Sequence, residues 1–100
     1  MAVKLLMTWN IQQGREREYF EFLVQEFIPA LQEMGLNPED AWYTVYGDYP
    51  QILTGISAPN EAVLQRVLES PEWKNLLRRL ENYVTDIQFK VVPHRDTFQL

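Results

Sequence analysis

The amino-acid sequence predicts an α+β domain whose elements follow the order strand, helix, strand, strand, helix, strand. Apolar and polar residues alternate near both ends of the chain, a pattern typical of strands with one buried face. Between them, two segments repeat apolar residues at the helical period, and these flank two segments rich in aromatic and β-branched residues. Because the chain has 100 residues, we expect residues 1–100 to form a single domain.

The first strand is expected from Val3 to Ile11. One of its faces is apolar throughout and consists of Val3, Leu5, Met7, Trp9 and Ile11. The other face is mixed and consists of Lys4, Leu6, Thr8 and Asn10. Gly14 ends this segment, and the charged residues 15–18 then open a helix.

The first helix is expected to run to about Met34, with Gly35 as its stop, since glycine tolerates a left-handed backbone. Its apolar residues recur three and four positions apart, and this predicted core stripe is Phe20, Leu23, Phe27, Leu31 and Met34. Pro29 lies inside the helix, where it removes one hydrogen bond, so we expect a kink there.

A hairpin is expected next. Residues 37–40 are predicted to be a loop, Ala41 to Tyr46 a strand, residues 47–50 a turn, and Gln51 to Ser57 the returning strand. A shorter helix then begins at residues 59–61 and restarts at Ser70, which is suited to cap a helix whose first residue is Pro71. The last strand is expected from Val84 to Pro93.

This order of elements is the ferredoxin-like βαββαβ plan, a four-stranded antiparallel sheet with helices on one face. The open face of such a sheet is normally polar. Here both sides of the second strand carry large side chains, with Trp42 and Tyr46 on one side and Tyr43 on the other. An apolar open face predicts a homodimer in which two sheets pack against each other to form an α/β barrel.

Composition excludes several classes of function. The chain contains no cysteine, which excludes disulfides and thiolate zinc sites and suits a reducing compartment. Its net charge of −5 argues against nucleic acid as a partner. The apolar run near Met1 is too short for a signal peptide, and no segment is long enough to cross a membrane, so we expect a cytoplasmic protein without a membrane partner.

Three segments indicate a family. The first is Gly14 with the charged turn and Glu18-Tyr19-Phe20, the second is residues 27–31 with Gly35, and the third is Ser70-Pro71-Glu72-Trp73. Together they resemble the dimeric α/β-barrel superfamily, which includes antibiotic-biosynthesis-monooxygenase-like, NIPSNAP-like and ethanol-degradation-protein-like members. The resemblance implies a homodimer with a ligand cavity between the sheet and the helices of each protomer. It implies no particular reaction.

Haem-degrading members of this superfamily use an asparagine on the first strand, a tryptophan, and an iron-ligating histidine on the long helix. In this chain the asparagine position, counted back from Gly14, holds Met7, and Asn10 has the opposite strand parity. Trp73 is the candidate for the family's tryptophan, but residues 71–82 contain no histidine. The resemblance therefore does not extend to haem ligation, and we expect no cofactor.

His94 is the single histidine and a weak candidate for a general base, although a solvent-exposed residue at a strand end is the favoured interpretation. No metal site is expected, because one histidine without cysteines would need carboxylates at ligand spacing. Asn10 is the other weak catalytic candidate. The candidates for a ligand pocket are Met7, Trp9, Trp73, Phe20 and Tyr43, for which packing in the core or an interface is the competing interpretation.

Two functions remain open from the sequence. One is a non-catalytic dimeric module that binds a small apolar or aromatic ligand or serves in assembly. The alternative is a cofactor-independent monooxygenase-like or isomerase-like enzyme that acts on a small aromatic or lipophilic substrate. The missing acid–base pair favours the first, and the family resemblance favours the second.

Overall fold

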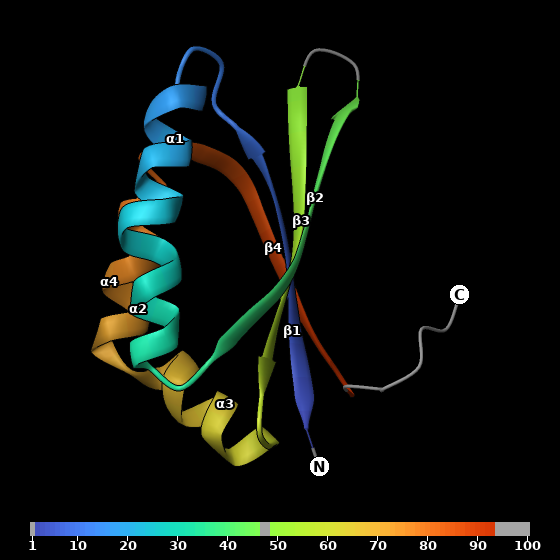
Figure 1. Ribbon diagram of the computed structural model, residues 1–100, viewed down its shortest axis with the longest axis vertical. Helices are drawn as coiled ribbons and strands as arrows, with labels where there is room; N and C mark the ends of the chain where they lie inside the picture. The colour runs from blue at the N-terminus through green and yellow to red at the C-terminus, as the bar shows by residue number, and fades with distance from the viewer. Residues whose placement is uncertain (1, 47–48, 94–100) are drawn as a thin grey trace.

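One antiparallel sheet and a layer of helices make up residues 2–46 and 49–93, which are described by the computed structural model; for residues 40–46, 49 and 50 only the backbone is described. Within those ranges the strands are β1 (Val3–Ile11), β2 (Asn37–Tyr46), β3 (Tyr49–Ala58) and β4 (Val84–Pro93), arranged in the order β2-β3-β1-β4. The helices lie on one side of the sheet (Figure 1). The predicted α+β, ferredoxin-like fold is confirmed.

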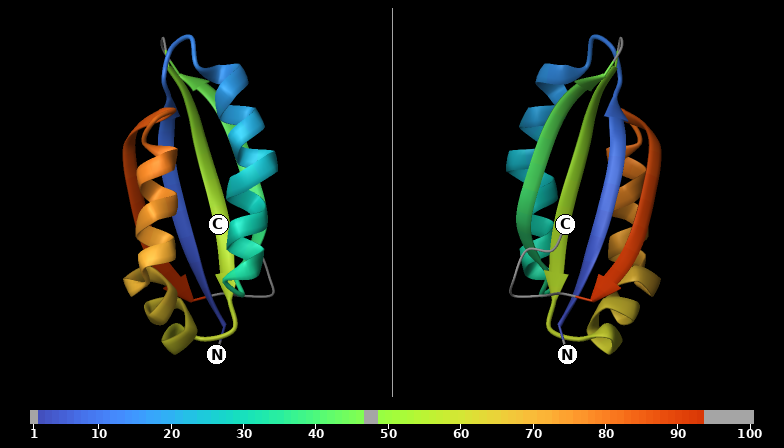
Figure 2. Two further views of the ribbon diagram at one scale, coloured as in Figure 1. Left: turned by 90° about the vertical axis from the view of Figure 1, so that its left-hand side faces the viewer. Right: turned by 90° about the vertical axis from the view of Figure 1, so that its right-hand side faces the viewer.

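The central strand β1 organises the core. Its burial alternates along the whole length, and the predicted apolar face is buried beneath the helices. Cross-strand partners share a face, so Ile52 opposite Trp9 also faces the helices, whereas Leu53 opposite Thr8 lies on the open face. The right panel of Figure 2 looks onto that open face, in front of which the described chain places no helix.

The loop predicted for residues 37–40 is wrong, because β2 already begins at Asn37. This segment contains Pro38, but β2 is an edge strand, and an edge strand accommodates a proline whose missing N–H would face away from the sheet. The pairing of β2 with β3 shifts in register between Pro38 and Asp40, which marks a β-bulge next to the proline. The predicted turn 47–50 is also too long, since Tyr49 pairs with Tyr46 and begins β3.

The first helical segment combines α1 (Glu16–Phe22), a π-helical turn η1 (Leu23–Phe27) and α2 (Ile28–Glu33). It ends at Gly35, whose φ is +86°, as expected. The predicted core stripe is wrong at Phe20, which is 43% exposed, while Tyr19 and Phe22 are buried. The π turn explains the difference, because i→i+5 bonding brings Phe22 and Phe27 onto one face although they are five residues apart.

Pro29 lies at the second position of α2, directly after the π turn. Its ring would clash with the carbonyl of Gln25 in a regular α-helix, and it has no N–H to donate there. A widened π turn relieves both constraints. The irregularity expected at Pro29 therefore occurs as a change of helix type just before it, and that change sets which aromatic residues face the sheet.

The second helical segment consists of α3 (Glu61–Glu69) and α4 (Pro71–Leu80). It lies alongside the first helical segment in the same layer, on the same face of the sheet (Figure 2, left). Both begin at a side-chain cap. Asn60 Oδ1 accepts from the backbone N–H of Val63 at 2.8 Å, and Ser70 Oγ accepts from that of Trp73 at 3.2 Å. The cap predicted at Ser70 is confirmed.

Replacing Ser70 with alanine is expected to destabilise the protein by about 1 kcal/mol, because the N–H of Trp73 loses its acceptor. The measurement is urea unfolding followed by circular dichroism. Asn75→Ala in the interior of α4 is the control, and it should cost nothing because alanine is the better helix former there. Equal stability of Ser70→Ala and the wild type would contradict the capping role.

Candidate functional site

A cavity of about 220 Å³ lies between the first helical segment and the sheet. We call it the sheet–helix cavity, and its lining residues are Trp9, Tyr19, Leu23, Phe27, Ile28, Leu31, Pro38, Glu39, Ile52 and Thr54. They come from β1, β2 and β3 on one side and from α1, η1 and α2 on the other. Most are apolar, and the polar groups are few, a composition typical of small-molecule sites.

Trp9 and Tyr19 form a buried hydrogen-bonded pair in the wall of this cavity. The Trp9 Nε1–H donates to the Tyr19 hydroxyl oxygen at 3.0 Å, and both side chains are at most 1% exposed. Burial raises the pKa of Tyr19 to about 12, while the hydrogen bond from Trp9 opposes that shift. The phenol therefore stays protonated at neutral pH and is unsuited to act as a base.

Aromatic contacts hold this pair in place. The Trp9 ring meets Phe27 edge to face with centroids 5.9 Å apart, and it meets Tyr19 in the same way at 6.4 Å. Behind Phe27, the Phe22 ring stacks on Tyr83 at 5.1 Å. Such edge-to-face and stacked pairs favour fixed ring orientations, so the cavity wall is preorganised.

The polar part of the lining is Thr54, Glu39 and the phenol of Tyr19. Thr54 is 8% exposed and lies opposite Met7 on the helix-facing side of β3. The Glu39 carboxylate forms an ion pair with Lys4 Nζ at 3.2 Å, which partly offsets its negative charge. The cavity thus combines an apolar body with hydrogen-bonding groups at its margin.

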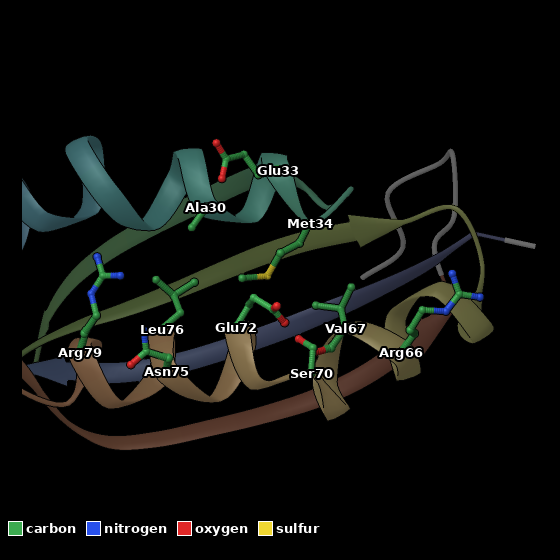
Figure 3. Close-up of a pocket in the computed structure, with 10 residues that line it drawn as sticks. All are labelled: Ala30, Glu33, Met34, Arg66, Val67, Ser70, Glu72, Asn75, Leu76 and Arg79. Atoms are coloured by element: carbon green, nitrogen blue, oxygen red, sulfur yellow. The ribbon is translucent and has the colours of Figure 1, made fainter.

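A second, larger depression of about 550 Å³ lies between α2 and the α3–α4 pair, and we call it the inter-helix groove. Figure 3 shows Met34 and Leu76 at its floor and charged residues around it. Glu33, Arg66 and Glu72 are exposed, and Arg79 is engaged with Glu26 and with the Phe22 ring. The groove is a solvated surface between helices with several charged residues, so the more apolar sheet–helix cavity is the better candidate site.

Of the residues singled out from the sequence, the structure places Trp9 in the sheet–helix cavity. Met7 and Trp73 are buried core residues that line neither cavity, and Phe20 is largely exposed. Tyr43 is placed opposite Ile52 by its backbone, and its side chain lies outside the described residues, as does the whole of His94.

Asn10 lies away from the cavity, on the open face. Its Nδ2 donates to Asp86 Oδ2 at 3.1 Å. Asp86 has a φ of +56° and occupies an extra position in β4, where the pairing with β1 shifts after Thr8. Asn10 therefore supports the bulge in β4, and the structure does not bring it together with the aromatic residues of the cavity.

Nine of the ten described lining residues, all but Trp9, were not among the pocket candidates predicted from the sequence. Thr54 did give a signal, because it is a polar residue between Ile52 and Ile56 on the apolar face of its strand. Tyr19 gave none, since its burial depends on the π turn. Among the residues whose side chains are described, 2–39 and 51–93, no three potential metal-ligating side chains form a group. None of the helices in those ranges has both the length and the apolar character needed to cross a membrane.

Comparison with solved structures shows the same fold. A NIPSNAP family protein from Agrobacterium tumefaciens superimposes with a TM-score of 0.70 at 15% identity, covering 96% of this chain and 95% of that one. An uncharacterized NIPSNAP domain protein from Burkholderia xenovorans gives a TM-score of 0.70 at 14% identity over 99% of both chains. No protein-family model and no curated protein matches the sequence.

An antibiotic-biosynthesis-monooxygenase-like protein from Deinococcus radiodurans is similar to the same extent, with a TM-score of 0.69 at 14% identity over 100% of this chain and 98% of that one. The resemblance found in the sequence is thus confirmed in the fold. The chain has the ferredoxin-like fold that the NIPSNAP and monooxygenase-like proteins share.

Proposed function

We propose that this protein is a non-catalytic binding module that holds a small apolar or aromatic ligand in the sheet–helix cavity. The observation that supports it is the cavity itself, about 220 Å³ in size and lined mostly by aromatic and aliphatic side chains. A solidly packed core would have left no such space beside Trp9. An apolar ligand gains contacts there with a wall that is already in place.

The volume limits the size of the ligand. An apolar cavity of about 150 Å³ is known to accept benzene, so 220 Å³ suits a single substituted ring or a short branched chain. It is below the roughly 300 Å³ at which pockets for drug-sized molecules begin. The proposed ligand is therefore a compound of about ten non-hydrogen atoms, not a polycyclic or a nucleotide.

We also propose that the open face of the sheet pairs with a second copy of the chain. Leu6 and Leu53 lie on this face, and Leu53 is 36% exposed. Together with Thr8, Gln88 and Lys90 they line a hollow of about 250 Å³ at the sheet surface. Four strands of nine or ten residues present about 600 Å² in projection, and their contoured surface approaches the roughly 800 Å² per partner of a standard interface. Two such faces related by a twofold axis cover each other.

The second candidate is a cofactor-independent monooxygenase-like or isomerase-like enzyme. It is favoured by one observation, the fold shared with the monooxygenase-like protein from Deinococcus radiodurans. Such an enzyme would consume oxygen or rearrange its substrate. Recovery of an aromatic ligand unchanged after prolonged aerobic incubation with the protein supports the binding module, and a new product supports the enzyme.

The binding proposal predicts that α-methylstyrene, an apolar one-ring compound, binds to the protein and perturbs the NMR signals of Trp9 and Phe27. Replacing Leu23 with phenylalanine fills part of the cavity and should weaken binding about tenfold. Leu77→Phe is the matched control, because Leu77 is also a half-buried helical leucine but lines neither cavity. Absence of binding to the wild type, or equal loss in both variants, would contradict the proposal.

A further inference from the structure

We infer that the ligand of the sheet–helix cavity is a neutral compound with a hydrogen-bond-accepting oxygen, such as a ketone, aldehyde or ester, which the hydroxyl of Tyr19 recognises as a donor. This inference rests on the proposed function, because it specifies which ligand the same cavity takes. It follows from the hydrogen-bond inventory, the charges of the lining and the rigidity of the aromatic wall.

The Tyr19 hydroxyl has one proton to donate and two lone pairs. One lone pair accepts the Trp9 Nε1–H at 3.0 Å. That bond fixes the hydroxyl as an acceptor toward Trp9 and leaves its proton to be donated elsewhere. Among the described residues, Trp9 is the hydrogen-bonding partner of this side chain, so the proton is not used by any of them. Tyr19 is fully buried in the cavity wall, and a ligand that seats against it is the acceptor that we infer.

The buried surroundings of Tyr19 favour donation of its hydroxyl proton to a ligand. A buried hydroxyl without an acceptor loses the hydrogen bond that it makes to water when exposed, and a ligand oxygen restores it. Since burial holds the pKa of Tyr19 at about 12, the proton is present throughout the physiological range. Trp9 is held by Phe27 and Tyr19, so the hydroxyl keeps its acceptor side toward Trp9.

The charges of the lining indicate that the ligand is neutral. Of the described lining residues, Glu39 is the charged one, and the lining includes no lysine, arginine or histidine. A carboxylate or phosphate ligand would enter an apolar space in which no cation of the lining offsets its desolvation, and Lys4, the cation that pairs with Glu39, is not in the lining. A carbonyl oxygen accepts the phenol proton without that cost.

The test uses two probes of nearly equal shape, acetophenone and α-methylstyrene, in which a C=O and a C=CH₂ group occupy the same position. The ratio of their affinities, measured by calorimetry, is compared between the wild type and Tyr19→Phe. We expect this ratio to fall about three- to tenfold in favour of the alkene when the hydroxyl is removed. Tyr83→Phe is the matched control, because Tyr83 lines neither cavity, and it should leave the ratio unchanged.

A second measurement needs no variant and so does not depend on whether Tyr19→Phe folds. The C=O stretching frequency of ¹³C-labelled acetophenone bound to the wild type should be lower than in hexane, because a hydrogen-bond donor weakens the carbonyl bond. If neither probe binds, the proposed function fails. If both bind but the ratio and the frequency do not change, the binding module stands and the inferred ligand class is overturned.

Discussion

Replacing Trp9 with alanine is expected to lower the free energy of unfolding by about 4 kcal/mol and the melting temperature by roughly 20 °C. Trp9 is 1% exposed on the central strand and contacts Tyr19 and Phe27 edge to face. Its removal enlarges the existing cavity and leaves Tyr19 without its hydrogen-bond donor. Thermal unfolding followed by far-UV circular dichroism measures the change.

Phe20→Ala is the matched aromatic truncation for this experiment. Phe20 lies on the same helical segment as Tyr19 but is 43% exposed, so the loss should be no more than about 1 kcal/mol. If Phe20→Ala were as destabilising as Trp9→Ala, the π-helical register that turns Phe20 outward would be wrong. The comparison therefore shows which set of residues faces the core: the one predicted by regular α-helical spacing, or the one observed in the structure.

Leu53→Asp is expected to convert a dimer into a monomer, with the dissociation constant raised at least about a hundredfold. Leu53 lies on the open face, and in the proposed pairing an aspartate there would be buried without a partner, at a cost of roughly 3 kcal/mol or more. Twofold symmetry introduces the charge twice. Native mass spectrometry across a dilution series measures the result.

Val24→Asp is the control for the dimer experiment. Val24 is 65% exposed on the outer side of η1, so the same kind of change at that position should leave the dimer intact. Dissociation by both variants would indicate an interface on the helical face. A monomeric wild type at micromolar concentration would contradict the sheet-to-sheet pairing altogether.

The prediction of the fold succeeded where structure depends on local pattern. β1 was predicted with its bounds and with its buried face, because strict alternation over nine residues has one interpretation. The Ser70 cap and the stop at Gly35 were predicted because capping and left-handed backbone depend on single residue types. The start of β2 was missed because tolerance of Pro38 depends on whether the strand lies at an edge.

The candidate site was predicted less well. Of the five pocket candidates, Trp9 lines the cavity, and its neighbours there include Tyr19 and Thr54, which were not singled out. A cavity is what remains unfilled after residues distant in sequence have packed, and a pattern within one segment does not contain that information. Tyr19 illustrates this, because one extra residue in the π turn exchanges it with Phe20 as the residue that faces the sheet.

Local patterns in the amino-acid sequence were enough to predict the order of the elements, the faces of the central strand, the helix boundaries at Ser70 and Gly35, and the likeness in fold to the NIPSNAP and monooxygenase-like proteins. These follow from short-range periodicity and from the backbone preferences of single residues. The contact between Tyr19 and Trp9, the π turn before Pro29, and the space between helix and sheet could be found only in the folded protein. Those features arise where two layers pack, and the volumes of side chains from different elements set the outcome.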